Sequence, residues 1–164
     1  SSSSNTYVSA GYASHNTGGL DKHGRLWVLD RFKGQWGLPE LIDNIQNAYT
    51  KWAPFGLWVE DAASGTPAVQ VLMEESPGIP INSVTPSGNK RSRAHALSQY
   101  LHGARVVFPK YAEWFEDAKH ELMHYGYSGH DDDVDALFIL ADNLFNTRHP
   151  AEYDNIPNMS MKMR

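Results

Sequence analysis

The pattern in this sequence most able to do chemistry is an acidic run, residues 130–136 (HDDDVDA). It places the carboxylates of Asp131, Asp132, Asp133 and Asp135 within five positions, where they repel one another more strongly than in bulk water. One or two aspartates are explained by a helix start, because they complement the helix dipole there. Aspartate inside a helix is unfavourable, so Asp135 needs a reason. The run favours a divalent-metal site, since Mg²⁺ and Mn²⁺ prefer carboxylate oxygens.

A metal site of this kind needs a carboxylate from another part of the chain, and Glu60 is the natural partner. It follows residues 55–59 (FGLWV), a short apolar run typical of a buried strand. Ligands of open α/β sheets collect where strands end, which favours a site there. Taken alone, Glu60 and Asp61 are also consistent with a solvated strand end. Two ions about 4 Å apart would activate a water molecule for phosphodiester hydrolysis and stabilise the leaving oxygen.

A basic group lies between these two acidic segments. Lys90, Arg91 and Arg93 follow Gly88 at a predicted helix start, where they could bind phosphates or form a solvated first turn. The spaced glycine of a phosphate-binding ATPase loop is missing ahead of Lys90, so the sequence predicts no ATPase. The eight histidines show no zinc-helix spacing, and no serine lies in a nucleophile elbow.

Composition limits the class of protein. The 164 residues are 41% hydrophobic and 12% aromatic, as in one globular domain. The absence of cysteine excludes a disulfide framework and a thiolate zinc site. No apolar run approaches the roughly 20 residues of a membrane span, and the start has no signal-peptide pattern, so we expect no membrane partner and a cytoplasmic location. The net charge of −5 disfavours a plain nucleic-acid binder more than a nuclease, whose acidic cluster is neutralised by metals.

The periodicity of the apolar residues predicts an α/β fold in one domain, residues 1–146, followed by a polar tail, residues 147–164. An antiparallel hairpin opens the sheet and mostly parallel strands continue it, with helices on its faces. The predicted order is loop 1–5, strand 6–14, turn-rich segment 15–24, strand 25–30, helix 38–52, strand 55–59, helix 65–75, strand 79–84, helix 90–101, strand 105–108, helix 111–122, glycine-rich loop 125–129 and a last helix that buries residues between 134 and 145.

Several motifs along this order resemble the C-terminal nuclease domain of the large terminase subunit of tailed bacteriophages, which has an RNase H-like fold. They are a strand that ends in Glu before a small-residue turn (residues 57–65, LWVEDAASG), the Lys90-x-x-Arg93-Ala94 helix, a strand near residues 103–109 (GARVVFP), the Glu121-Leu122 pair and the 130–136 signature. The last motif is the most specific, and together they extend from about residue 7 to residue 145.

The resemblance implies a role for each acidic residue. Glu60 and Asp132 would be metal ligands, and Asp131 would support or share the site. Asp135 would bind metal or orient the helix and its ligands. Asp133 is expected to be solvated.

The resemblance also assigns the basic residues and exposes one departure. Lys90 would lie near the scissile phosphate, and Arg91 and Arg93 would bind DNA, although Arg93 could instead be structural. The family's first metal-binding aspartate lies on an opening strand, which this chain is expected to lack. Asp21, in a turn, and Asp30, at the far end of the hairpin, do not replace it.

The sequence therefore predicts a two-metal (Mg²⁺ or Mn²⁺) endonuclease domain that cuts double-stranded viral DNA with little sequence preference during genome packaging. By resemblance, its partners would be the terminase ATPase domain, the small terminase subunit and the portal protein, in the cytoplasm of the host cell. Two alternatives stay open. One is a nuclease of the resolvase or transposase type with the same fold, and the other is a non-catalytic interaction module whose acidic loop binds a partner or Ca²⁺.

Overall fold

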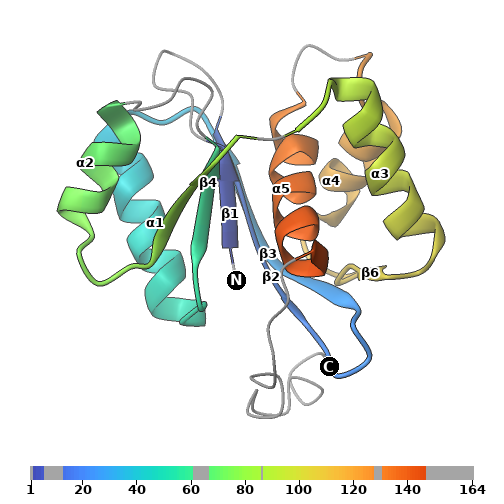
Figure 1. Cartoon of the computed structure of the whole chain (residues 1–164), viewed down its shortest axis with the longest axis horizontal. Coiled ribbons are helices and arrows are strands. Elements are labelled where there is room, and N and C mark those ends of the chain that lie inside the picture. The colour runs from blue at the N-terminus through green and yellow to red at the C-terminus, as the bar shows by residue number, and fades with distance from the viewer. Residues whose placement is uncertain (1, 6–12, 61–66, 86, 128–130, 147–164) are drawn as a thin grey trace.

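The computed structural model describes residues 2–5, 13–60, 67–85, 87–127 and 131–146, which form one sheet with helices on both faces (Figure 1). The strand order is β5-β4-β1-β2-β3-β6. The β1–β2 and β2–β3 pairs are antiparallel, whereas β1–β4, β4–β5 and β3–β6 are parallel. The strands are β1 (Ser2–Asn5), β2 (Ala13–Leu20), β3 (Leu26–Gly34), β4 (Leu57–Glu60), β5 (Ile81–Val84) and β6 (Val106–Val107).

Helices α1 and α2 cover one face of the sheet, and α3, α4 and α5 lie on the other (Figure 1). Their bounds are α1 (Leu38–Trp52), α2 (Pro67–Glu75), α3 (Lys90–His102), α4 (Phe115–Met123) and α5 (Asp132–Asn146). The predicted α/β class with a mixed sheet is confirmed. None of the helices in the described part of the chain is long and apolar enough to cross a membrane.

Strand β4 shows how the alternation of a strand aims the residue at its end. Leu57 and Val59 pack into the core under α1 and α2, whereas Trp58 packs into the core under α5. Since successive side chains of a strand point to opposite faces, Glu60 is directed to the α5 face, like Trp58. The sequence-predicted strand thus ends with its carboxylate on the side of the acidic run.

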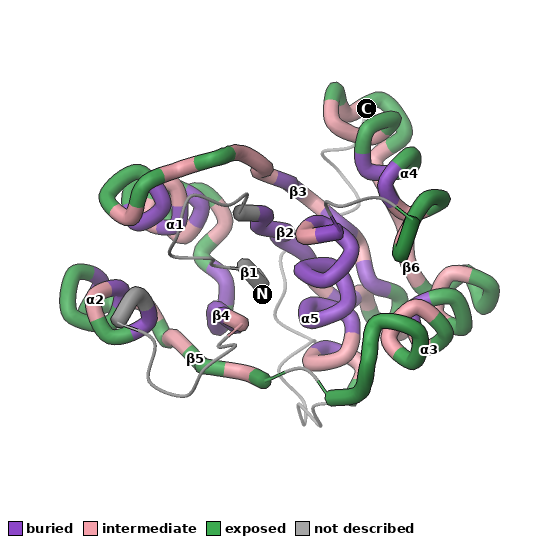
Figure 2. The backbone as a smooth tube through the Cα atoms, turned by 90° about the horizontal axis from the view of Figure 1, so that it is seen from above, coloured by how far each residue is buried: buried purple, intermediate pink, exposed green. Residues whose placement is uncertain are grey.

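Helix α5 is the central helix of its layer. It contacts β1, β2, β3 and β4 as well as α3 and α4, and it is buried along most of its length (Figure 2). A helix that is apolar on nearly all sides belongs in the interior. Ala136, Ile139 and Leu140 of α5 are accordingly buried. Its first turn is consequently held in a fixed place against the sheet.

A β-bulge in the hairpin decides which side chains of β3 face α5. The register between β2 and β3 shifts between Thr17 and Gly18. Before the shift Val28 packs into the α5-side core; after it, Asp30 bonds to Lys51 and Trp52 of α1, and Arg31 bonds to α5. A bulge adds one residue to one strand, so the alternation changes phase and Arg31 takes the face that regular pairing would give to Asp30.

Most predicted elements are found within a few residues of their expected bounds, and the errors lie at the start of the chain. The loop predicted for residues 1–5 is wrong, because Ser2–Asn5 forms β1 between β4 and β2. The turn-rich prediction for residues 15–24 is wrong up to Leu20, because Ala13–Leu20 forms β2 and the turn occupies residues 21–24. Residues 6–12, most of the predicted first strand, lie outside the described residues, as does the tail 147–164.

Candidate functional site

A row of residues lies at one end of the sheet, where the three parallel strands β1, β4 and β5 end. Asn5 of β1 is in register with Glu60 of β4 on one side and with Ser14 of β2 on the other, and Glu60 is in register with Val84 of β5. The row places the ends of β1, β4 and β5 side by side, with the first turn of α5 over the same part of the sheet. Such an edge is where α/β proteins bind ligands.

Glu60 is a largely buried carboxylate that lacks a bonded partner on one oxygen. Its Oε2 atom is buried and accepts no hydrogen bond within the described part of the chain. Burial raises the pKa of Glu60, and the nearby negative charges of Asp135 and Asp132 raise it further, against the opposing charge of Arg93. Asp132 and Asp135 are three residues apart and therefore share one side of the first turn of α5. The charges of Asp132 and Asp135 on α5 thus act on Glu60 at the end of β4.

Asp131 directly precedes α5 and is almost completely buried. Its Oδ2 atom accepts a hydrogen bond from Lys90 Nζ at 2.8 Å, and its Oδ1 atom accepts one from the Gly126 backbone N–H at 3.3 Å. The hydrogen bond to Asp131 raises the pKa of Lys90, which keeps the ammonium charged. The lysine side chain is 57% exposed, so it closes the acidic cluster from the solvent side.

Asp135 is held by a cation and a phenol. Its Oδ1 atom accepts hydrogen bonds from Arg93 Nε at 3.3 Å and from the Tyr125 hydroxyl at 2.7 Å. Burial raises the pKa of Tyr125, and the bond to Asp135 adds to this, so the phenol stays a proton donor. Arg93 also donates to the Gly88 carbonyl at 3.1 Å, which ties α3 to the loop before it.

The expectation that Asp133 is solvated is wrong. Asp133 is 5% exposed and faces the sheet, where its carboxylate accepts hydrogen bonds from Ser14 Oγ at 2.6 Å, Asn16 Nδ2 at 3.3 Å and Arg31 Nε at 2.6 Å. Its backbone N–H donates to Glu121 Oε1 at 3.0 Å. The residue therefore fixes the start of α5 on β2, which sets the position of the aspartates on either side of it.

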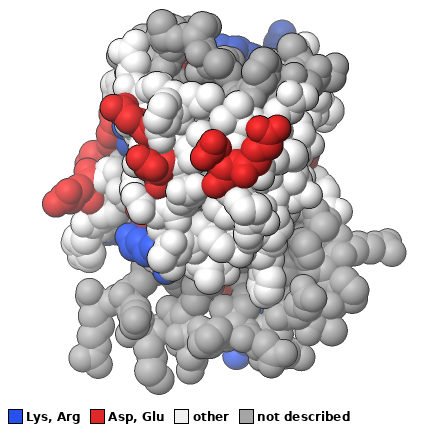
Figure 3. Space-filling view, turned by 90° about the vertical axis from the view of Figure 1, so that its left-hand side faces the viewer, with Lys and Arg blue, Asp and Glu red and all other residues white. Residues whose placement is uncertain are grey.

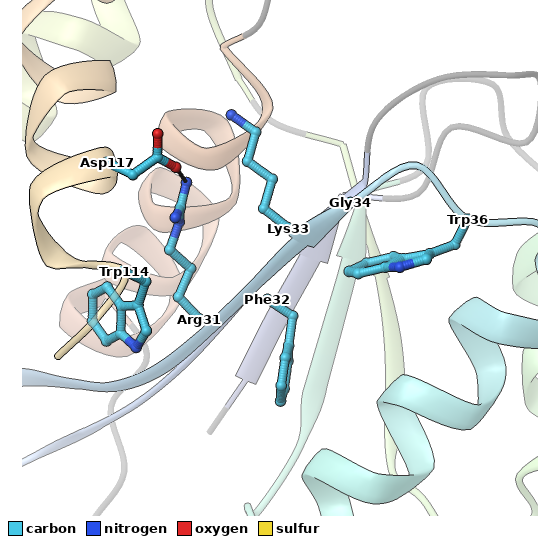
Figure 4. Close-up of a pocket in the computed structure, with 7 residues that line it drawn as sticks. All are labelled: Arg31, Phe32, Lys33, Gly34, Trp36, Trp114 and Asp117. Carbon is cyan, nitrogen blue, oxygen red and sulfur yellow. Dashed lines mark hydrogen bonds and ion pairs between the residues drawn. The ribbon is translucent and has the colours of Figure 1, made fainter.

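Arg31 connects this anchor to α4. Its guanidinium also bonds Asp117 at 2.7 Å (Figure 4). It lies 3.7 Å from Glu121, which pairs with Lys33. A cavity of about 510 Å³ adjoins these residues at the end of β3, lined in addition by Trp36 and Trp114. None of the predicted site residues lines it, and its cations are already paired.

The residues at the strand ends suit a divalent metal in chemistry but not yet in arrangement. The donors are carboxylates, and the unpaired buried oxygen of Glu60 gains a partner when a cation binds. In the described part of the chain, no three His, Asp or Glu side chains form a group that holds a metal ion as they stand. Lys90 and Arg93 bond Asp131 and Asp135 instead. A metal therefore has to displace at least one of these cations.

Several of the residues that the sequence singled out lie near one another, and other residues around them had no sequence signal. The structure brings Glu60, Asp131, Asp132, Asp135 and Lys90 together, with Arg93 turned inward and Arg91 exposed; their metal and DNA roles stay predictions.

Tyr125 and Arg31 had no sequence signal, because each contacts its aspartate only through the fold. Asp21 and Asp30 lie away from the site: Asp21 accepts bonds within its own turn and from Trp27, and Asp30 faces α1.

Comparison with known families agrees with the motifs. The model of the terminase RNase H-like domain matches residues 17–144, which is most of the chain. No curated protein sequence matches it.

Solved structures show the same fold at low sequence identity. The large terminase of a thermophilic bacteriophage has a TM-score of 0.62 at 10% identity, over 86% of this chain and 39% of that one. The yeast mitochondrial Holliday junction resolvase Ydc2 has a TM-score of 0.56 at 13% identity, over 87% and 77%. The RuvC protein of Thermus thermophilus has a TM-score of 0.50 at 12% identity, over 88% and 94%. The fold is therefore RNase H-like, and the chain spans well under half of the terminase it matches.

Proposed function

Because the chain belongs to the terminase RNase H-like domain family, we propose that it cleaves double-stranded DNA with little sequence preference during viral genome packaging. Family and fold support a nuclease, and the chemistry of the strand-end site supports the specific reaction. The observation that carries the proposal is Glu60, a half-buried carboxylate whose Oε2 atom has no hydrogen-bond partner among the described residues and whose pKa is raised by burial and by the charges of Asp135 and Asp132. A buried carboxylate oxygen without a partner is one that a bound cation can satisfy.

We assign Mg²⁺ or Mn²⁺ as the cofactor, with Glu60, Asp132 and Asp131 as ligands and Asp135 as a further ligand or as the residue that orients them. Divalent ions supply an activated water and stabilise the negative charge on the phosphate oxygens. Asp133 holds the start of α5 on β2, so the ligands on α5 keep a fixed distance from Glu60. The carboxylates together lower the cost of concentrating positive charge beside DNA.

Lys90 changes its partner in this scheme, and Arg93 stays in place. In the structure they neutralise Asp131 and Asp135. Once cations bind the carboxylates, the exposed Lys90 is free to bind the phosphate, while the more buried Arg93 stays close to α5. Lys90 thus positions the scissile phosphate at the ligand cluster, which is the role that the resemblance gave it.

One corner of the site carries no carboxylate. Strand β1 occupies the centre of the sheet, yet Ser2–Asn5 contains only serine and asparagine. Asn5 is in register with Glu60. We therefore expect Asn5→Asp to increase Mn²⁺-dependent cleavage of this chain, and an unchanged or lower rate would contradict a third ligand there.

The packaging role implies further partners. We propose that the terminase ATPase domain, the small terminase subunit and the portal protein act with this domain in the host cytoplasm. Family membership supports this assignment.

The central experiment measures Mn²⁺-dependent nicking and linearisation of a plasmid by the 164-residue chain. Asp132→Asn keeps the shape of the side chain and removes its charge, so cleavage should fall by at least about 100-fold. Asp142→Asn, on the same helix about 15 Å further along, is the matched control and should cleave at the parental rate. Equal cleavage by the Asp132 variant and the parent would overturn the site.

The substrate separates this proposal from the two alternatives. Faster cleavage of a four-way junction than of linear duplex would favour a resolvase, as the two resolvase structures with the same fold suggest. Metal binding without cleavage of either DNA, in the parent and in Asn5→Asp, would favour an interaction module. We expect linear and branched duplexes to be cut at comparable rates.

A further inference from the structure

Helix α3 lies in the longest segment of this sequence that has no Asp or Glu residue. Residues 76–112 contain none of the 19 Asp and Glu residues but five of the 14 Lys and Arg residues. The chain as a whole has a net charge of −5 and therefore repels a polyanion. Because the carboxylates are concentrated elsewhere, the α3 side is where repulsion of DNA is smallest.

The outward side of α3 forms a continuous polar stripe. Arg91, His95, Ser98 and His102 recur at i, i+4, i+7 and i+11, so they lie on one line along the helix. All four are exposed, and Leu97 on the opposite side is the helix's buried residue (Figure 2). These four residues are called the outer face of α3 below. None of them is acidic, and the face begins one residue after Lys90.

Arg91 begins this face, and Arg105 lies beyond its end, against Tyr100 on the other side of α3 and against Phe145 of α5. Arg91 and Arg105 are exposed, and neither forms an ion pair with another described residue. Arg105 is stacked on Phe145, with Cζ 3.9 Å from the ring centroid, and lies 5.5 Å from the ring of Tyr100. A guanidinium stacked on an aromatic ring can still donate hydrogen bonds in its own plane, which suits a phosphate. Arg93, by contrast, is committed to Asp135.

We propose that the outer face of α3, extended by Arg105, binds the phosphate backbone of the DNA duplex whose cleavage is proposed above. The inference rests on that proposed function and adds the surface along which the duplex lies. From Arg91 to His102 the helix extends about 16 Å, at 1.5 Å per residue. This is about half of the roughly 34 Å turn of B-DNA, enough to contact backbone on both sides of one groove. The duplex leaves the strand-end site at Lys90 and follows α3 toward Arg105.

The opposite side of the molecule supports this direction by its charge. Helices α1 and α2 carry Glu40, Asp43, Glu74 and Glu75, all exposed, and acidic side chains gather on that face (Figure 3). A duplex crossing the ends of β4 and β5 therefore meets repulsion toward α2 and attraction toward α3. Charge complementarity selects one of the two paths away from the site.

The test is the affinity of the whole chain for a fluorescently labelled linear duplex, measured by anisotropy in EDTA over a series of salt concentrations. Binding is thereby separated from cleavage. Arg91→Glu should weaken binding by at least about tenfold, and Arg91→Ala should reduce the slope of log K against log salt by about 1. Arg105→Ala should reduce the slope similarly. The matched control is Lys119→Glu, the same charge reversal on the exposed side of α4, which should leave affinity within about twofold.

The outcomes separate this inference from the proposed function. If the parent binds through α3 but does not cut in Mn²⁺, the inference stands and the nuclease proposal fails. If the parent cuts but Arg91→Glu and Lys119→Glu bind equally well, or if the parent binds no duplex, the inference is overturned. Circular dichroism and the midpoint of thermal unfolding verify that each variant is folded. An Arg91→Glu variant that fails to fold leaves the decision to the salt slopes of Arg91→Ala and Arg105→Ala.

Discussion

Two regions around the start of α5 surround their carboxylates in opposite ways. On the sheet side, Asp133 is surrounded by donors from Ser14, Asn16 and Arg31. On the strand-end side, Glu60 faces other carboxylates and has an oxygen without a partner in the described part of the chain. The donors around Asp133 stabilise its negative charge, whereas the negative charge around Glu60 is left for a bound cation to neutralise.

The contrast is between Asp133 in the first turn of α5 and Glu60 at the end of β4. Buried ionised groups are tolerated when they are paired and hydrogen-bonded, and Asp133 meets that condition. Glu60 does not, and burial raises its pKa. Unfavourable charge accumulated at a strand end is typical of a site that binds a cation. Carboxylates in the two regions therefore have different surroundings, and only the direction of each side chain shows which surroundings it has.

The largest expected effect is on the paired side. Arg31→Met keeps the bulk but leaves Asp133 and Glu121 buried without their guanidinium, so the free energy of unfolding should fall by about 3–5 kcal/mol. Urea unfolding followed by circular dichroism measures it. Arg25→Met removes an exposed arginine paired with Asp21 and should cost no more than about 1 kcal/mol. Equal losses in the two variants would mean that Asp133 is not held by charge.

A second effect arises on the other side of β2. His15 is buried against Phe32, and neither ring nitrogen has a hydrogen-bond partner among the residues that the structure describes. Burial lowers the pKa of His15 to about 4, although the charge of Asp30 opposes this. As pH falls below about 6.5, the unfolded chain binds a proton that the folded chain does not, so stability is lost between pH 6.5 and 4.

The loss from His15 should approach about 3 kcal/mol, since each pKa unit corresponds to about 1.4 kcal/mol. Urea unfolding at pH 7 and at pH 4.5 measures it. His15→Phe should flatten the dependence relative to the parent, whereas His23→Phe, at an exposed histidine, should reproduce the parent. An unaltered pH dependence in His15→Phe would show that this histidine is protonated in the folded chain.

The sequence was sufficient for the parts of the fold that depend on local pattern. The 3.6-residue period predicted α1, and the apolar run before Glu60 predicted β4 and the direction of its end. The acidic run together with Glu60 predicted a site, because carboxylates can be recognised from residue type alone. These features need only neighbours along the chain.

The remainder depends on contacts between distant segments. Arg31 reaches Asp133 across 102 positions, and only because the bulge at Thr17 and Gly18 changes the phase of the hairpin. Asp133 was expected in solvent because the residues next to it in the sequence do not indicate a hydrogen-bond partner on β2. Ser2–Asn5 has no strand propensity of its own and becomes β1 by pairing on both edges with β2 and β4. Tertiary pairing overrode local preference in each case.

A smaller effect tests the unpaired side. Glu60→Gln removes a buried negative charge beside Asp132 and Asp135, so without divalent ions the variant should be more stable than the parent by on the order of 1 kcal/mol. Adding Mn²⁺ should raise the unfolding midpoint of the parent but not of the variant. Glu40→Gln, at an exposed glutamate of α1, should respond to Mn²⁺ like the parent. Equal stabilisation of the Glu60 variant and the parent by Mn²⁺ would remove Glu60 from the ligand set.

The smallest expected change in stability separates a competing cation from a structural one. The Lys90–Asp131 pair lies at the surface on the lysine side, so Lys90→Met should cost only about 0.2–1 kcal/mol. If this ammonium occupies a ligand, its removal should also strengthen Mn²⁺ binding several-fold, as titration calorimetry would measure, although cleavage of DNA should fall because the phosphate loses its partner. Lys119→Met, at a loose surface pair on α4, should alter neither quantity. Weaker Mn²⁺ binding in Lys90→Met would instead show that Lys90 positions Asp131 for the metal. The strand-end site would then hold its carboxylates with paired cations, as Asp133 is held by Arg31.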